Sequence, residues 1–333
     1  MFKYLLVSLI LLSASIAEDG WLKKKIKERW IKKQSEQKAP LASQDIKTKL
    51  TKPGFHTFTL THQEHQRYYK VYLPKNFQPS RSYPLVFAFH GGGGNMEIQS
   101  NERYYKLISK ADKEGYALVF PNGFSLFNSG KYATWNAGAC CAEARDQKID
   151  DVGFVREVFQ AIKSQVNIDT KKVFAIGMSN GAMLSYRLAC EAFDIFKAIA
   201  AVAGTDNTLL CSPLRPVSIL HIHARDDEHV LYLGGRGPKA SKPEKVTDYV
   251  SVAKTMDKWA QILKCDSQPN EATPLKGVAV STYKNCPQAT LKLISLDKGG
   301  HSWPGGVKPR GKKVNESPIS ANEEIWKFFK ELP

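Results

Sequence analysis

From about Gly54 onward, short apolar runs alternate with segments of helical periodicity. Several runs are apolar at consecutive positions, which is typical of strands buried on both faces of a parallel sheet. The predicted strands cover residues 69–73, 85–89, 116–120, 173–176, 198–203, 217–223 and 291–296. Because these runs alternate with helical segments, the pattern predicts a mostly parallel sheet with helices on both faces.

Three helices are predicted between and after these strands. Apolar residues between positions 154 and 166 fall on one helical stripe, and Asp150 and Asp151 precede it with carboxylates that can cap free N–H groups. The other two helices are predicted over 246–263 and 320–332. No linker-like stretch interrupts the alternation, so residues 53–333 are predicted to form a single doubly wound α/β domain.

The first 52 residues follow a different pattern. Residues 1–17 have a basic residue at Lys3, an apolar run and small residues before Glu18, as in a secretory signal peptide; the alternative is a retained N-terminal anchor. Within the next segment, residues 18–52, positions 21–33 carry seven Lys or Arg, with Leu22, Ile26 and Trp30 four apart. This spacing predicts a basic amphipathic extension that lies on an anionic membrane surface, or a solvated tether.

The chain of 333 residues has 48 Lys and Arg against 32 Asp and Glu, a formal net charge of +16. Residues 18–50 account for only part of it, so the α/β domain is itself basic. A noncatalytic binder of anionic polymers or membranes is therefore an alternative hypothesis. No helix-turn-helix, zinc-finger or RNA-binding signature accompanies the charge, and we expect no nucleic-acid partner.

The most informative motif is Gly-Met-Ser-Asn-Gly at 177–181, which follows the predicted strand at 173–176 and precedes a helical stretch. A sharp strand-to-helix turn with glycines on both sides is the nucleophile elbow that presents a serine hydroxyl. We therefore predict that Ser179 is a catalytic nucleophile. The alternative is a glycine-rich turn with an incidental serine.

A His-Gly-Gly-Gly-Gly run at 90–94 directly follows the predicted strand at 85–89. Its main-chain N–H groups are not covered by side chains, so Gly91 and Gly92 are predicted to form an oxyanion hole together with the N–H of Asn180. Phosphate binding is disfavoured, because the loop has neither a GxGxxG pattern nor a following Lys-Ser/Thr.

An acid and a base follow later strands. Asp226 and Asp227 come just after the strand at 217–223, and His301 lies in a turn-rich loop after the strand at 291–296. A serine needs an imidazole to take its proton, and the imidazole needs a carboxylate to hold its tautomer. The order Ser179, Asp227, His301 is that of α/β-hydrolases. This chemistry requires no cofactor and no metal.

A metal site is the alternative use of His221 and His223, which alternate along one predicted strand close to Asp226, Asp227 and His229. Paired histidines on an apolar strand more often belong to a packed or substrate-facing surface, so we predict no metal.

Together the motifs resemble the polyhydroxybutyrate depolymerase and feruloyl esterase family of secreted α/β-hydrolases, similar to carbohydrate esterase family 1. The matching segments are HGGGG at 90–94, TWNAG at 134–138, IDDVGF at 149–154, GMSNGA at 177–182, GGHSWPGG at 299–306 and ISANEEIWKFF at 319–329. The resemblance covers roughly residues 54–333 and omits the basic extension.

The resemblance implies a secreted serine carboxylic-ester hydrolase with the α/β-hydrolase fold, periplasmic if the source is Gram-negative. It implies Asp227 as the triad acid, although Asp226 beside it and Ala224 in place of a usual glycine depart from the family pattern. It places Trp135, Asn136 and Trp303 near the acyl site. It also pairs Cys190 with Cys211 and Cys265 with Cys286, leaving Cys140 and Cys141 as a vicinal disulfide or two thiols.

The substrate remains open at this point. A polyester, a feruloylated or acetylated polysaccharide and a small ester all require the same triad and oxyanion hole. A serine peptidase or a lipase on the same fold is a further alternative.

Overall fold

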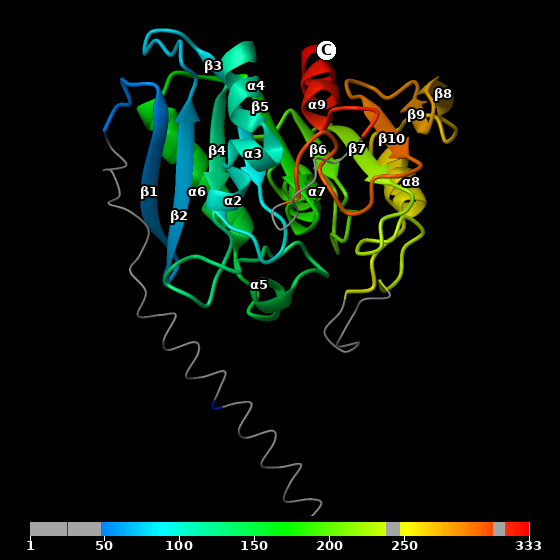
Figure 1. Cartoon of the computed structure of the whole chain (residues 1–333), viewed down its shortest axis with the longest axis horizontal. Coiled ribbons are helices and arrows are strands. Elements are labelled where there is room, and N and C mark those ends of the chain that lie inside the picture. Colours follow the sequence, from blue (N-terminus) through cyan, green and yellow to red (C-terminus); the bar gives the residue numbers. More distant parts are fainter. Residues whose placement is uncertain (1–24, 26–47, 238–246, 309–316, 333) are drawn as a thin grey trace, which may run out of the picture.

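The computed structural model describes residue 25 and residues 48–237, 247–308 and 317–332. Its strands are β1 Gly54–His62, β2 His65–Leu73, β3 Tyr83–Phe89, β4 Ala117–Pro121, β5 Ile168–Met178, β6 Ala198–Val202, β7 Ser218–Ala224, β8 Asn270–Leu275, β9 Val278–Tyr283 and β10 Leu291–Leu296. Within the described residues they form one ten-stranded sheet in the order β1-β2-β4-β3-β5-β6-β7-β10-β9-β8 (Figure 1).

The middle of the sheet is parallel, from β4 through β3, β5, β6 and β7 to β10. Every residue of β4, β6 and β7 is buried, which explains why these strands read as continuous apolar runs. The antiparallel pair β1 and β2 adds one edge, and β9 and β8 add the other. All of β8 is exposed, and its polar sequence gave no strand signal.

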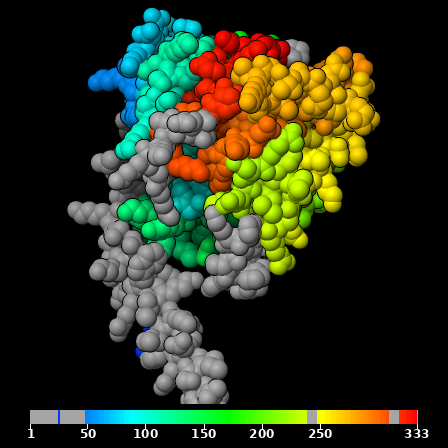
Figure 2. Space-filling view, turned by 45° about the vertical axis from the view of Figure 1, so that its right-hand side comes forward, coloured from blue at the N-terminus to red at the C-terminus, as the bar shows by residue number. Residues whose placement is uncertain are grey.

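Helices cover both faces of the sheet. The described helices are α2 Met96–Gln99, α3 Glu102–Tyr105, α4 Leu107–Glu114, α5 Ala142–Asp146, α6 Asp151–Gln165, α7 Asn180–Glu191, α8 Val252–Ile262 and α9 Ala321–Lys330. Alternate residues of β5 divide between two apolar clusters: Val173 packs with α6, α7 and α8, and Phe174 packs with α4 and α9. Figure 2 shows α9 against the segment that contains α3 and α4. The predicted fold class is confirmed.

Helix bounds follow from capping. The Asp150 side chain accepts the N–H of Gly153 at the start of α6, as the sequence predicted. The predicted helix over 246–263 instead begins at Val252, because the Ser251 hydroxyl accepts the N–H of Lys254 and the chain before it is extended. No helix among the described residues is long and apolar enough to cross a membrane. The predicted signal peptide and nearly all of the basic extension lie outside the described residues.

Disulfides join helix ends to the connections that follow. Cys190 near the end of α7 bonds to Cys211, and Cys265 after α8 bonds to Cys286 before β10. These are the two pairs that the family resemblance implied, and both are confirmed. Cys140 and Cys141, left open by the sequence, form a vicinal disulfide.

Candidate active site

Ser179 lies in the turn between β5 and α7, with φ 56° and ψ −123°. A residue with a side chain adopts such a positive φ only where the surroundings enforce it. Here the flanking glycines bring main chains into contact. A Cβ on Gly181 would lie 2.3 Å from the carbonyl oxygen of Phe89, and one on Gly177 would lie 2.3 Å from the carbonyl carbon of Gly181. The predicted strand–turn–helix is present, and close packing explains both glycines.

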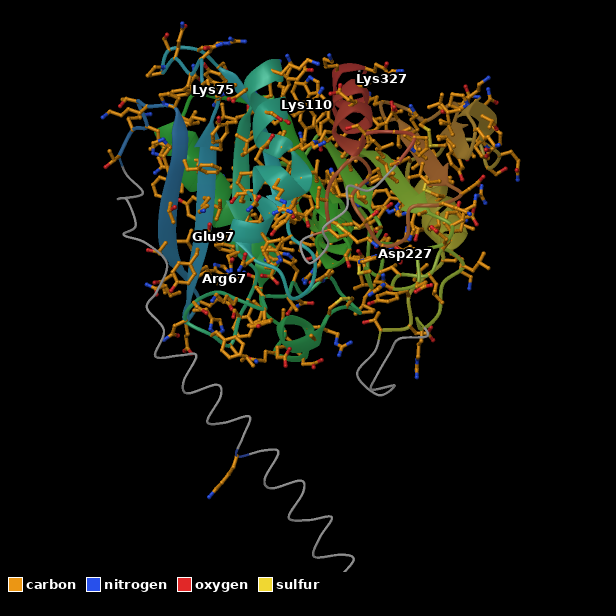
Figure 3. The ribbon with its side chains drawn as sticks, viewed as in Figure 1. Arg67, Lys75, Glu97, Lys110, Asp227 and Lys327 are labelled. Atoms are coloured by element: carbon orange, nitrogen blue, oxygen red, sulfur yellow. A yellow bond between two sulfur atoms is a disulfide. The ribbon has the colours of Figure 1, made fainter. Side chains whose placement is uncertain are left out.

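His301 and Asp227 meet from loops that follow β10 and β7. The Nδ1 atom of His301 lies 2.8 Å from Oδ2 of Asp227, whose side chain is fully buried. An ionised carboxylate only accepts hydrogen bonds, so Nδ1 carries the proton and Nε2 keeps its lone pair. The other carboxylate oxygen, Oδ1, accepts the main-chain N–H groups of His229 and Val230 at 2.8 and 3.0 Å. In Figure 3 Asp227 lies in the lower right part of the domain, whereas Lys75 and Lys327 lie near its upper edge.

The neighbouring carboxylate has a different task. Oδ1 of Asp226 accepts the N–H of Gly300 at 2.8 Å, and this side chain is exposed. Asp226 therefore holds the loop that carries His301, while Asp227 contacts the imidazole itself. From the sequence, either Asp226 or Asp227 could be the acid beside the histidine. In the structure the two carboxylates point in different directions, and it is Asp227 that contacts His301.

A chain of buried side chains supports Asp227 from behind. The Nε2 atom of His223 lies 2.8 Å from the carbonyl oxygen of Val230 and 3.4 Å from Oδ2 of Asp227. His223 Nδ1 lies 3.0 Å from His221 Nε2, and His221 Nδ1 lies 2.6 Å from the Tyr186 hydroxyl. Burial acts to raise the pKa of Asp227, but hydrogen bonds from His223 and His301 outweigh it and hold this pKa well below the usual range.

When both imidazoles are neutral, the acceptors at the end of this chain set the direction of its hydrogen bonds. A carbonyl and a carboxylate can only accept, so His223 donates from Nε2 and its Nδ1 is an acceptor. His221 must then donate from Nε2, which leaves its Nδ1 to accept the Tyr186 O–H. Burial and the neighbouring His223 lower the pKa of His221 well below its usual value, so it stays neutral. His221 and His223, the alternative metal ligands, thus bond to each other, and each donates its N–H in the direction of Asp227.

The glycine loop after β3 is fixed by His90. Nε2 of this buried imidazole accepts the N–H of Gly123 at 2.9 Å, so Nδ1 carries the proton and donates to the Gly91 carbonyl at 2.8 Å. Burial lowers the pKa of His90 to about 4, which keeps it in this neutral form. In a trans peptide the N–H points opposite to the carbonyl, so the Gly92 N–H points away from His90. A Cβ on Gly92 would lie 3.6 Å from the Cβ of Asn180.

Asn180 clamps the loop at 134–138. Its Oδ1 accepts the Trp135 N–H at 2.7 Å and its Nδ2 donates to the Trp135 carbonyl at 3.0 Å. The Trp135 ring is fully buried and donates to the His90 carbonyl. Asn136 is also buried; its N–H donates to Asp151, which forms a buried ion pair with Arg67.

Trp303 lies on the other side of the sheet. Its indole N–H donates to Asn322 of α9 at 3.0 Å, and Asn322 in turn donates to the carbonyls of Tyr105 and Lys106. The three predicted substrate contacts, Trp135, Asn136 and Trp303, are therefore buried side chains outside the cavity described next. In this structure they hold the main chain around the site, and their placement gives no support for contact with substrate.

A cavity of 480 Å³ brings Ser179, His301, Gly92 and Asn180 together, whereas Asp227 and Gly91, also predicted for the site, do not line it. It is lined by Gly92, Thr134, Cys141, Ala142, Ser179, Asn180, Glu228, His229, Val230, Gly237, Tyr249 and His301. Sequence reasoning gave no role in the wall to His229 or Tyr249. The His229 ring stacks on that of His301, with centroids 4.9 Å apart. The sequence did contain a signal for His229. It lies two residues after Asp227, in the turn whose main-chain N–H groups donate to the Asp227 carboxylate.

Comparison with known proteins decides the family. The family model described as putative esterase matches residues 61–285, about two thirds of the chain. This chain belongs to that esterase family. The putative esterase NocK of Nocardia uniformis is 30% identical over 239 residues, 68% of this chain and 67% of that protein.

Other relatives of this esterase carry named activities. Feruloyl esterase B of Piromyces equi is 27% identical over 241 residues, 70% of this chain and 42% of that longer protein. The probable feruloyl esterase C of Aspergillus clavatus is 27% identical over 271 residues, 79% and 83% of the two chains. The acetyl xylan esterase of Aspergillus awamori shares the fold, with a TM-score of 0.58 at 14% identity over 82% of this chain and 98% of the other. The protein is a carboxylic ester hydrolase with the α/β-hydrolase fold.

Proposed function

We propose that this esterase cleaves its substrate by an acyl-enzyme mechanism in which Ser179 is the nucleophile, His301 the base and Asp227 the acid. The observation that carries the proposal is the 2.8 Å contact of Asp227 with His301 Nδ1, in a cavity whose wall contains both His301 and Ser179. The strained main chain at Ser179 adds support, because such strain is typical of functional positions.

The reaction proceeds in two acyl transfers. His301 Nε2 takes the Ser179 hydroxyl proton as the oxygen attacks the ester carbonyl, and Asp227 stabilises the imidazolium. The N–H groups of Gly92 and Asn180 bind the oxyanion, each contributing about 3 kcal/mol to transition-state stabilisation. Collapse breaks the C–O bond, and His301 gives its proton to the leaving alcohol. Water, activated by the same imidazole, then releases the acid and restores Ser179.

The proposed substrates are feruloylated or acetylated polysaccharides. Relatives of this chain are named feruloyl esterases and a bifunctional acetylxylan esterase/xylanase, which supports this class. A cavity of 480 Å³ is large enough for an aromatic or a short acyl group. The test compares turnover of methyl ferulate, acetylated xylan and a 3-hydroxybutyrate oligomer by the purified protein. Faster turnover of either of the first two supports a polysaccharide ester over a polyester. A clear preference for the oligomer would contradict the polysaccharide assignment.

We propose further that the protein is exported. Its disulfides and the signal-peptide pattern of residues 1–17 support this. Residues 21–33 are proposed to contact an anionic membrane surface. Deleting residues 18–50 should weaken binding to anionic lipid vesicles, and unchanged binding would contradict that contact.

The nucleophile is tested by Ser179→Ala, with Ser164→Ala on the exposed end of α6 as the matched control. Hydrolysis of a short-chain aryl ester should fall by at least about 10⁴-fold in the first variant and stay unchanged in the second. Both should keep the thermal transition of the parent protein. Retained turnover in a folded Ser179→Ala protein would rule out this nucleophile.

A further inference from the structure

A second and larger cavity, of 680 Å³, lies at the other end of the strands that carry the active site. Ser179, Asp227 and His301 follow the carboxyl ends of β5, β7 and β10. The larger cavity is lined by residues at or before the amino ends of the same strands, among them Thr170, Arg215 and Gln288. β7 has seven residues, so roughly 20 Å separate the two cavities. A molecule in the larger cavity leaves the catalytic one open.

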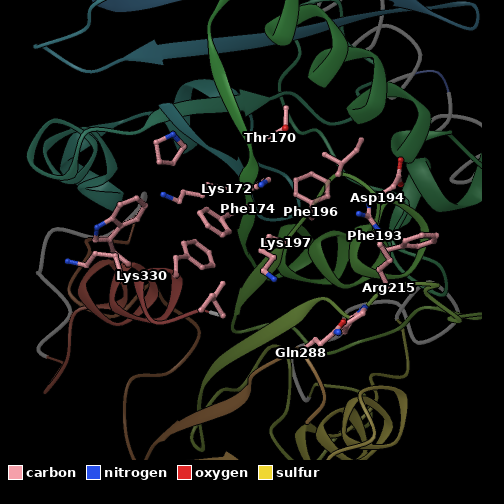
Figure 4. A pocket seen from close by; sticks show the side chains of 17 residues that line it. Thr170, Lys172, Phe174, Phe193, Asp194, Phe196, Lys197, Arg215, Gln288 and Lys330 are labelled. Atoms are coloured by element: carbon pink, nitrogen blue, oxygen red, sulfur yellow. The ribbon is translucent and has the colours of Figure 1, made fainter. Parts of the chain in front are cut away.

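The rim of this cavity is strongly cationic. Five basic side chains from four parts of the chain line it: Lys171, Lys172, Lys197, Arg215 and Lys330. Figure 4 shows Lys172 and Lys197 beside the centre of the cavity, with Lys330 and Arg215 toward opposite ends. The cations therefore extend along the cavity instead of gathering at one point, which suits a ligand that carries several negative charges.

Nearby carboxylates neutralise only part of the positive charge at this rim. Asp194 is the acidic residue in the lining, and Arg156 outside it already holds both oxygens of Asp194, at 2.8 and 2.6 Å. Lys172 and Lys330 have carboxylate partners at 3.7 and 3.5 Å, and because both lysine side chains are exposed, these pairs are weak.

Three of the rim cations have no carboxylate within 4.0 Å in the described part of the chain: Lys171, Lys197 and Arg215. Lys171 lies in the first half of β5, Lys197 directly precedes β6, and Arg215 lies shortly before β7. Their positive charge is therefore available to a ligand.

The floor between the cations is aromatic. The rings of Phe174 and Phe329 stack with centroids 4.1 Å apart, and Trp326 and Phe196 complete an apolar surface. Trp326 already donates its indole N–H to Glu114, so it offers the cavity only its ring. Because these rings are almost fully buried, they shape the cavity, and the cationic rim is the part that can recognise a ligand.

We propose that this cavity binds an acidic polysaccharide through uronate sugars, whose carboxylates pair with Lys171, Lys197 and Arg215. The sugar class rests on the proposed function, whereas the negative charge follows from the rim alone. A cavity of 680 Å³ is large enough to hold sugar units of a carbohydrate chain. The rings of the floor are almost fully buried and do not form platforms on which nucleic-acid bases could stack. The site would hold the polymer while Ser179 acts on an ester elsewhere along it.

The test measures binding of an oligogalacturonate to full-length Ser179→Ala protein by titration calorimetry, so that binding is read without turnover. The variant carries Lys171→Gln, Lys197→Gln and Arg215→Gln. The matched control removes three exposed lysines outside the cavity, by Lys113→Gln, Lys254→Gln and Lys276→Gln. Both have the same net charge and the same basic extension. We expect Kd to rise about tenfold or more in the variant and to change less than about twofold in the control.

A neutral xylo-oligosaccharide of equal length should bind at least about tenfold more weakly than the oligogalacturonate, and added salt should weaken the acidic ligand further. Equal Kd values for variant and control would overturn the site. Phosphatidylserine vesicles or a single-stranded oligonucleotide binding more tightly than the oligogalacturonate, with loss in the same variant, would overturn the choice of ligand. Because binding is measured in Ser179→Ala protein, a failed esterase assay and a failed binding assay are separate results.

Discussion

Replacing Asp227 with asparagine tests the triad through its proton positions. Oδ1 of Asp227 accepts two main-chain N–H groups, from His229 and Val230. The asparagine carbonyl must occupy that position, so its NH₂ group faces His301, where the carboxylate had accepted a hydrogen bond. The imidazole then meets a donor at Nδ1 and moves its own proton to Nε2. In that tautomer it cannot take the Ser179 proton.

The expected loss is about 10⁴-fold in kcat, the effect of this substitution in serine hydrolases of the same chemistry. At 1.36 kcal/mol for each factor of ten, this is about 5 kcal/mol of transition-state stabilisation. The control is Asp226→Asn, which keeps an oxygen to accept the Gly300 N–H and should change kcat less than roughly threefold. Steady-state hydrolysis of an aryl acetate, with thermal melts of each variant, measures both. Equal losses in the two variants, or more than about a tenth of kcat left in Asp227→Asn, would refute the reasoning.

Three further predictions concern the supporting structure. Replacing His223 with Phe removes the inner donor to Asp227, so kcat should fall about tenfold with KM unchanged; a change in KM alone would contradict the positioning role. His90 has its pKa lowered to about 4, whereas an unfolded histidine titrates near 6.5. The unfolded chain therefore binds the extra proton, and stability should fall by roughly 3 kcal/mol as pH drops from about 6.5 to 4. Urea midpoints of the parent and His90→Gln should show the smaller pH dependence in the variant, and identical slopes would exclude His90 as the cause. Replacing both Cys265 and Cys286 with serine opens a link across 21 positions and should cost about 3 kcal/mol in unfolding free energy, with kcat kept within twofold; a large loss of kcat would mean that this disulfide supports the site.

The sequence predicts the central sheet well, because its strands are buried on both faces and their residues are apolar without interruption. It also predicts the strand–turn–helix around Ser179, since such a turn requires glycines where main chains touch. The exposed β8 was missed because an edge strand needs no apolar residues. Helix α8 begins later than predicted because the Ser251 side chain caps it. Apolar periodicity does not reveal such a local hydrogen bond.

Within the site, residue type alone could not separate contact with substrate from support of the main chain. Trp135 belongs to a loop beside Ser179, yet the amide of Asn180 holds that loop with the indole turned inward. The pairing of His221 with His223 followed from their alternation along a strand. Their partner Tyr186 comes from α7, and only the packing of that helix on the sheet reveals it.

The bond between Trp303 and Asn322 has a consequence for the order in which the site is assembled. Asn322 lies in α9, and it ties the segment just after His301 to the carbonyls of Tyr105 and Lys106 at the end of α3. The strand that leads to His301, β10, lies between β7 and β9 in the sheet. Ser179 and Asp227 precede β10 and α9 in the sequence, so they are synthesised before the residues that hold the His301 loop. The proposed nucleophile is therefore present in the growing chain before its proposed base can be fixed in place.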